Sequence, residues 1–234
     1  MPVRPGPVRD RATRRRRVAR LGAIDPYLHN RPELLDQKKC KRRRRFTPDL
    51  TEFRKWQQAL ARDVNDSQRE DFVVHFTENY DSQMPIWLVT ESMKFGTIVR
   101  LVDLLRGSQA NAIAAHFGIP SGSHFHSIAL GLNILRNIAA HHNRLWNRSF
   151  TFQPKRVGRL PGVNPAWKHF DAVEDGRIYR LLGGLALALS AVSGVTDWAS
   201  QTTDLIATFP DVPLLSPHAD MGFPQDWQDQ QPWG

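Results

Sequence analysis

The sequence predicts an all-α protein, and three observations lead to this class. From residue 47 onward, apolar residues recur at the three- and four-residue spacing of amphipathic helices. Gly and Pro fall mainly between these segments, where they start or end helices. No β-hairpin signal, glycine-rich phosphate loop or internal repeat stands out. At 234 residues the chain is long enough for one sizeable core, so we expect a helical bundle.

The first 45 residues differ from the rest of the chain in charge. They hold 16 Lys/Arg and 4 Asp/Glu, a net charge of +12, whereas the other 189 residues hold 16 and 19, a net charge of −3. Residues 1–20 are rich in Pro and Arg, and a second basic run, KKCKRRRRF, covers residues 38–46. Such composition favours disorder. We therefore predict a basic, disordered segment over 1–45 and a helical domain over 46–234, with attraction to RNA coming mainly from the basic segment or from local patches.

The helices are expected in the following order. Thr47 and Pro48 predict a helix start, with Phe53, Trp56, Leu60 and Val64 on its buried face. Further helices are predicted over residues 67–80, 85–107, 108–117, 123–147, 176–193 and 196–207. The last segment, from residue 209, is rich in Pro and is predicted to be an extended tail over the surface.

Several classes of protein are disfavoured by the composition. The longest mostly apolar run, residues 181–195, is shorter than the ~20 residues that span a bilayer. The first residues are charged but have no apolar core behind them, so they do not resemble a secretory signal. Cys40 is the single cysteine, which excludes an intramolecular disulfide and a cysteine-cluster zinc site. His124 and His126 lack a carboxylate or cysteine at ligand spacing. We therefore expect a cytoplasmic protein without membrane contact, metal or cofactor.

A conspicuous polar stretch, RNIAAHHNRLWNRSF, covers residues 136–150 of the predicted helix 123–147. Helical spacing puts His142 on an apolar face with Leu135, Ala139 and Trp146, which predicts a core or boundary histidine. The same spacing forms a polar stripe from Asn137, His141, Arg144 and Arg148, with Arg136 at its edge. This stripe is either a solvated helix face or a surface that meets an anionic ligand.

One carboxylate, that of Glu91, falls on an apolar stripe between Trp87 and Phe95. A buried carboxylate is costly unless it is paired. Glu91 is therefore either a boundary residue that reaches solvent or a group that orients a donor from another helix, such as His142 of the polar stretch.

The polar stripe has the residue types that RNA cleavage without a metal would use. Histidine transfers protons near neutral pH, and arginine gives bidentate donors to phosphate oxygens. Cleavage needs two proton transfers, whereas the stripe supplies one histidine, His141. A homodimer with two such helices face to face would supply both.

These residues resemble a known family. Arg136-Asn137-x-x-x-His141 is similar to the R-x(4–6)-H motif of HEPN-domain ribonucleases. The longer string LRNIAAHHNRLWNR resembles the signature of the Abi family of bacterial abortive-infection proteins, as do FVVHFTENY, MPIWLVTESMKFG and MGFP with Trp227. The resemblance covers roughly residues 21–230. Family members usually carry a further helical N-terminal part, and from the resemblance we expect that part to be missing or replaced here.

The resemblance implies a HEPN-like helical bundle that dimerises through the motif helix and cleaves RNA during phage infection. It implies that Arg136 and His141 are the catalytic pair and that Asn137 assists them. Arg144 and Arg148 are expected to bind RNA, and Glu91 and His142 to support the site. Two alternatives stay open: a non-catalytic RNA-binding module, or a toxin recognised by an RNA or protein antitoxin.

Overall fold

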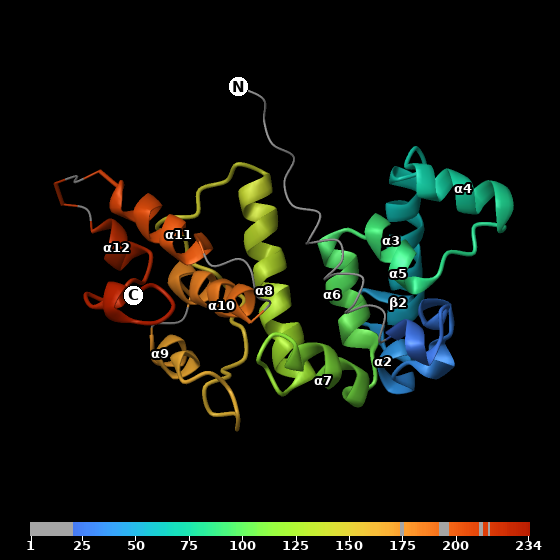
Figure 1. Cartoon of the computed structure of the whole chain (residues 1–234), viewed down its shortest axis with the longest axis horizontal. Helices are drawn as coiled ribbons and strands as arrows, with labels where there is room; N and C mark the ends of the chain where they lie inside the picture. The colour runs from blue at the N-terminus through green and yellow to red at the C-terminus, as the bar shows by residue number, and fades with distance from the viewer. Residues whose placement is uncertain (1–20, 174–175, 192–196, 211–212, 215) are drawn as a thin grey trace. The chain divides into compact units, whose positions relative to one another are not determined.

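The all-α class is confirmed by the computed structural model, which describes residues 21–173, 176–191, 197–210, 213–214 and 216–234 (Figure 1). Helices dominate the described residues, and one two-stranded sheet accompanies them. The chain divides into two compact units with a boundary between Gln109 and Ala110. Within the described ranges, every helix falls short of the length and apolarity that a membrane crossing requires.

Unit 1 holds short elements at its start and longer helices after them. The elements are η1 (Leu28–Asn30), η2 (Pro32–Leu34), α2 (Gln37–Lys41), β1 (Arg43–Arg44), β2 (Thr47–Thr51), α3 (Glu52–Asp66), α4 (Asp71–Asn79), α5 (Ile86–Ser92) and α6 (Phe95–Leu104). Helix α7 (Gly107–Ala115) follows and crosses the boundary between the units.

Residues 21–45 belong to the folded part of unit 1, whereas the sequence suggested disorder there. Leu28, Leu35 and Cys40 are buried in this segment. Each lies in or beside a short helical turn, so apolar residues that are too widely spaced for a long amphipathic helix still reach the core. Residues 1–20 of the predicted basic segment lie outside the described residues.

The predicted helix start at Thr47 is wrong, because residues 47–51 form strand β2 of an antiparallel hairpin with β1. The helix begins four residues later. The Thr51 side chain accepts a hydrogen bond from the Arg54 backbone N–H at 3.3 Å and so caps α3. The predicted face is confirmed for Phe53, Trp56 and Leu60, which are buried. The Trp56 indole N–H donates to the Thr97 carbonyl at 3.0 Å and ties α3 to α6.

The helix predicted over residues 85–107 is two helices, α5 and α6, separated at Met93 and Lys94. Asp63, a buried residue of α3, explains the break, because its carboxylate accepts the Lys94 backbone N–H at 2.9 Å. A continuous helix would use that N–H for its own ladder. The buried carboxylate therefore determines where α6 begins.

Unit 2 packs its helices around an aromatic core. Its elements are α8 (Gly122–Ala140), α9 (Ala166–Ala172), α10 (Ile178–Ser190), α11 (Asp197–Ala207), α12 (Pro217–Asp220) and η3 (Trp227–Asp229). Helix α10 packs against both α8 and α9. The approach of α9 is close, since a Cβ added to Gly183 would lie 2.0 Å from the Phe170 ring.

The last segment of the chain is not an extended surface tail, contrary to expectation. Met221, Phe223, Trp227 and Trp233 are buried in the core of unit 2. Phe223 packs on the Tyr179 ring with centroids 4.5 Å apart. The prolines of this segment prevent a long helix, but aromatic rings between them still bury large apolar surfaces.

Candidate functional site

The polar stretch 136–150 begins on α8 and continues past its end. Helix α8 stops at Ala140, seven residues before the predicted end at 147. His142 adopts a left-handed conformation with φ of 53°. Its backbone N–H donates to Ala139 at 2.9 Å, and that of Asn143 donates to Ile138 at 3.1 Å. These two bonds form a Schellman motif, which closes the helix and turns the chain away from its axis.

The early end of α8 overturns the sorting of the two histidines by helical face. His142 was expected in the core or at its boundary, but its side chain is exposed, as is that of His141. Neither side chain forms a hydrogen bond or ion pair with another described residue. Both imidazoles are therefore open to a ligand, and helical spacing does not distinguish them.

Arg136 and Asn137 lie on the last turns of α8, and both are exposed. The Arg136 guanidinium donates to the Asn137 side-chain oxygen at 3.2 Å. This bond leaves the Asn137 amide N–H groups and the remaining Arg136 donors free for an acceptor such as a phosphate. The structure thus brings these two predicted site residues into contact, and it places His141 at the C-cap of the same helix.

The segment after the helix is held by two aromatic residues. Trp146 is half-buried against Phe209, with ring centroids 5.6 Å apart, so the prediction that it packs is confirmed. Phe150 is buried, and its backbone N–H donates to the Gly176 carbonyl at 2.8 Å. The Arg144 guanidinium lies over the Trp146 ring, 5.6 Å from its centroid. Arg144 is therefore placed by a packed aromatic ring, whereas Arg148 is exposed.

The polar stretch 136–150 carries positive charge and no acidic side chain. Residues 136–150 contain three arginines and no aspartate or glutamate. The exposed arginines and histidines can meet several oxygens of a polyanion, and the histidines can also exchange protons. We call Arg136, Asn137, His141, Arg144 and Arg148 the α8-end cluster.

Glu91 lies on α5 of unit 1, whereas the α8-end cluster belongs to unit 2. The break before α6 divides the apolar stripe on which Glu91 was placed, and Trp87 and Phe95 are each 38% exposed. Glu91 itself is half-buried. It therefore sits on a partly solvated face, and its link to the cluster stays a prediction.

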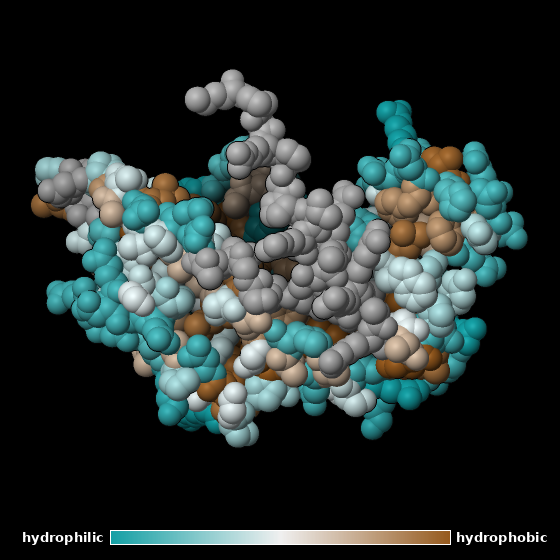
Figure 2. All heavy atoms as spheres, in the orientation of Figure 1, coloured by the Kyte–Doolittle hydropathy of each residue, from teal (hydrophilic) through white to brown (hydrophobic). Residues whose placement is uncertain are grey.

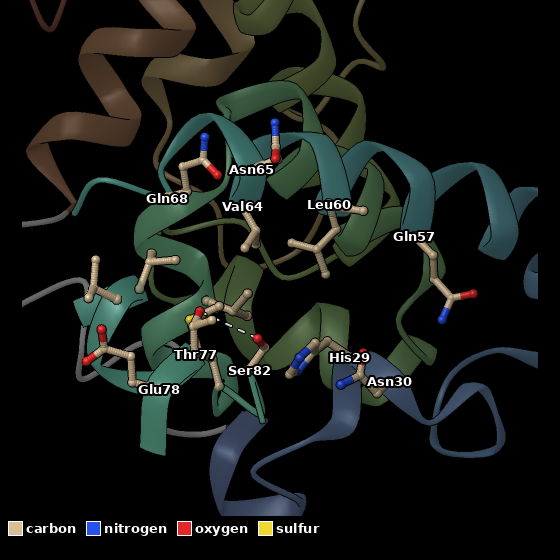
Figure 3. Close-up of a pocket in the computed structure, with 15 residues that line it drawn as sticks. His29, Asn30, Gln57, Leu60, Val64, Asn65, Gln68, Thr77, Glu78 and Ser82 are labelled. Carbon is tan, nitrogen blue, oxygen red and sulfur yellow. Dashed lines mark hydrogen bonds between the residues drawn. The ribbon is translucent and has the colours of Figure 1, made fainter. Parts of the chain in front are cut away.

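Unit 1 contains a cavity of about 610 Å³ that the sequence analysis missed (Figure 3). Residues of η1, α3 and α4 line it, and Leu60, Val64 and Met84 contribute apolar walls. His29 lines it too; it is 2% exposed, and its Nδ1 has no partner among the described residues. Burial lowers the pKa of His29 to about 4, against the opposing effect of Asp25, so this imidazole is neutral at pH 7.

Other candidate chemistry in the described residues is limited. They contain no group of three or more His, Cys, Asp and Glu side chains that could hold a metal ion. Cys40 is buried, and burial raises the pKa of its thiol to about 11. A thiol with so high a pKa is a poor nucleophile at neutral pH.

The fold and the site define an all-α protein with an exposed arginine–histidine cluster at the end of a long helix. The sequence model of the Abi-like protein family matches residues 11–147, more than half of the chain, so the chain belongs to this family. The match includes Arg136, Asn137, His141 and Arg144 but ends before Arg148. No curated protein matches the chain, and no solved structure does.

Proposed function

We propose that this Abi-like protein is a metal-independent endoribonuclease that acts in abortive infection, with the α8-end cluster as its active site. The observation that carries the proposal is the exposure of His141, which has no hydrogen-bond or ion-pair partner among the described residues and lies one residue beyond the helix that presents Arg136 and Asn137. An exposed imidazole can donate to or accept from a bound phosphodiester, and Arg136 and Asn137 on the last turns of the same helix supply further donors.

The proposed reaction is an internal transfer at one phosphate of RNA. One imidazole takes the proton of the ribose 2′-hydroxyl, whose oxygen then bonds to phosphorus. The bond from phosphorus to the 5′-oxygen breaks, and a second imidazole gives that oxygen a proton. The products are a 2′,3′-cyclic phosphate and a 5′-hydroxyl end. Arg136 and Asn137 donate hydrogen bonds to the phosphate oxygens as charge builds up on them.

A homodimer would bring two copies of the cluster to one phosphate and supply both imidazoles as His141 and the partner's equivalent. The exposed position of the cluster supports this arrangement, because no described residue of its own unit buries the His141 side chain. Arg144 and Arg148 would then bind the flanking phosphates of the RNA.

The first test is RNA cleavage in EDTA by the wild type and by single variants. We expect His141→Ala to lower kcat about 10²–10⁴-fold, the usual contribution of a general acid or base. Arg136→Ala should lower it about 10²–10³-fold, as the loss of one transition-state donor does. His142→Ala is the matched control, since it removes an exposed imidazole next in the chain. It should reduce kcat far less.

A mixing experiment tests the composite site. If the site uses one His141 from each chain, a mixed dimer of wild type and His141→Ala lacks one of the two imidazoles, so an excess of the His141→Ala chain should suppress cleavage by the wild type, with dimers seen by light scattering. Full cleavage by His141→Ala would sink the site assignment. Tight RNA binding without cleavage by the wild type would instead favour the non-catalytic RNA-binding module.

A further inference from the structure

The basic run of residues 38–46 takes no part in the proposed reaction, yet the structure gives it a defined shape. It contains seven Lys/Arg and no Asp/Glu. It begins in α2, continues through β1 and ends in the turn before β2. A tight hairpin in unit 1 therefore carries a dense positive charge.

The base of this hairpin is fixed to its own unit. The Arg42 guanidinium pairs with the Asp103 carboxylate at 2.8 Å, and the Lys39 ammonium approaches the same carboxylate at 3.7 Å. The Arg42 carbonyl accepts the Glu52 backbone N–H at 2.8 Å. These contacts hold α2 and β1 against α6 and α3, so Lys39 and Arg42 serve the fold.

The other cations of the run face solvent. Lys38, Lys41, Arg43 and Arg45 are exposed, and none of them forms an ion pair with a described residue. Arg43 donates to the Pro48 carbonyl at 3.0 Å, which holds its side chain along the hairpin without neutralising its charge. The exposed Asp49 on β2 carries a single negative charge and offsets only part of the positive charge of these cations, so the surface of the hairpin stays cationic.

Phe46 occupies the turn between the strands and is 92% exposed. Neither Arg45 nor Phe46 has a positive φ, so the backbone of this turn accepts most residue types and does not call for an aromatic one. A phenyl ring that stays exposed to water contributes none of the stabilising free energy that burial would give. Neither turn geometry nor packing within the described residues accounts for an aromatic residue here.

We propose that the turn of this hairpin, Arg45 and Phe46, together with the exposed cations Arg43 of β1 and Lys41 at the end of α2, binds single-stranded RNA. The ring of Phe46 offers a stacking face to an unpaired base, and the exposed cations that precede it meet the phosphates of the strand. This pairing of an aromatic platform with a positive backbone track is how proteins bind single strands without reading sequence. The inference rests on RNA being the substrate of the proposed function, but it needs no cleavage.

A single strand fits this hairpin turn better than a duplex or a membrane does. In a duplex the bases are stacked on one another, so an exposed ring finds no free base face. Membrane surfaces are bound by helices with a broad apolar face, whereas the hairpin tip exposes a single ring. The commonest cation of the run is Arg, whose planar donors suit phosphate.

The test measures binding of a fluorescent oligouridine to the full chain in the His141→Ala background, which removes the proposed base. Phe46→Ala should raise Kd about ten-fold, the usual loss for one stacked base. Arg45→Ala should raise Kd and lower the slope of log K against log salt by about 0.7. Leu205→Ala, an exposed apolar residue of unit 2, and Arg69→Ala, an exposed arginine of unit 1, are the matched controls and should change neither.

The possible outcomes separate this inference from the proposed function. If Phe46→Ala and Arg45→Ala bind oligouridine as their controls do, the hairpin inference is wrong, whether or not the wild type cleaves RNA. If they lose binding while the wild type cleaves nothing in EDTA, the inference stands and the ribonuclease proposal fails. If Phe46→Ala and Arg45→Ala instead lose the binding to phosphatidylserine vesicles that the wild type shows, while their RNA binding stays intact, the hairpin turn is a membrane contact and the inference is overturned.

Discussion

Two residues of each unit place a histidine and an aromatic ring in opposite environments. In unit 1, His29 is buried beside a cavity and Phe46 stands in solvent. In unit 2, His141 stands in solvent and Trp146 packs against Phe209. A buried imidazole loses its charge and contributes to packing, whereas an exposed one beside arginines stays free to exchange protons. Residue type alone therefore does not identify a functional group, because burial determines which role it takes.

The contrast between the two aromatic residues predicts the largest difference in stability. Trp146→Ala should lower the free energy of unfolding by about 2–4 kcal/mol, because the change removes a half-buried indole that packs on Phe209 and contacts the Arg144 guanidinium. Phe46→Ala should change it by less than about 0.5 kcal/mol, because its ring makes little contact with the protein. Urea unfolding followed by circular dichroism measures both. Equal losses would contradict the division between a packed and a free ring.

The contrast between the histidines predicts a dependence on pH. The pKa of His29 is lowered to about 4 in the folded chain, from 6.5 when unfolded. The unfolded chain therefore binds more protons between these values, and folding stability is lost as pH falls from about 6.5 towards 4. The loss from His29 should be on the order of 2 kcal/mol.

The measurement compares wild type with His29→Gln, which cannot take up the proton, in urea at pH 7, 5.5 and 4.5. The difference in stability between them should shrink or reverse at low pH. Leu205→Ala, which removes an exposed apolar side chain of unit 2 and no titratable group, is the control and should leave the pH profile unchanged. A constant difference between wild type and His29→Gln would show that His29 is not held neutral by burial.

The smallest expected effect concerns Asp103, which pairs with two cations at the base of the hairpin. Asp103→Ala should lower the free energy of unfolding by at most about 1 kcal/mol, since Arg42 and Lys39 are partly exposed. It should also make the slope of log K for RNA binding against log salt concentration steeper by roughly 0.7 for each cation that loses its carboxylate partner. A shallower dependence would mean that the hairpin base must be fixed for the tip to bind.

Part of the fold could be predicted because its signal is local. The buried face of α3 with Phe53, Trp56 and Leu60 follows the helical period, and α10 lies within the range expected for it. The break between α5 and α6 could not be predicted in this way. It depends on the buried Asp63 carboxylate, which lies about thirty residues earlier and bonds Lys94 at 2.9 Å.

The residues of the candidate site were proposed from the sequence and stay a prediction, and the structure changed the geometry expected for them. Arg136, Asn137 and His141 do share one exposed region at the end of α8. A helix that continued through Asn147 would place His142 in the core or at its boundary, whereas α8 ends at Ala140 and His142 is exposed. Polar residues such as those of NRLWNR fit a helix surface as well as a loop, so periodicity does not locate the end.

The sequence by itself determined the helical class, the positions of the main amphipathic helices, the charge of the N-terminal segment and the membership of an Abi-like family. Only the tertiary structure decided that α8 ends at Ala140, that both adjacent histidines face solvent and that Phe46 stands at the tip of a hairpin. The physical reason is that the spacing of apolar residues along the chain indicates which residues can share one face of a helix or strand. Where an element stops depends on competing contacts with distant residues, such as Trp146 on Phe209.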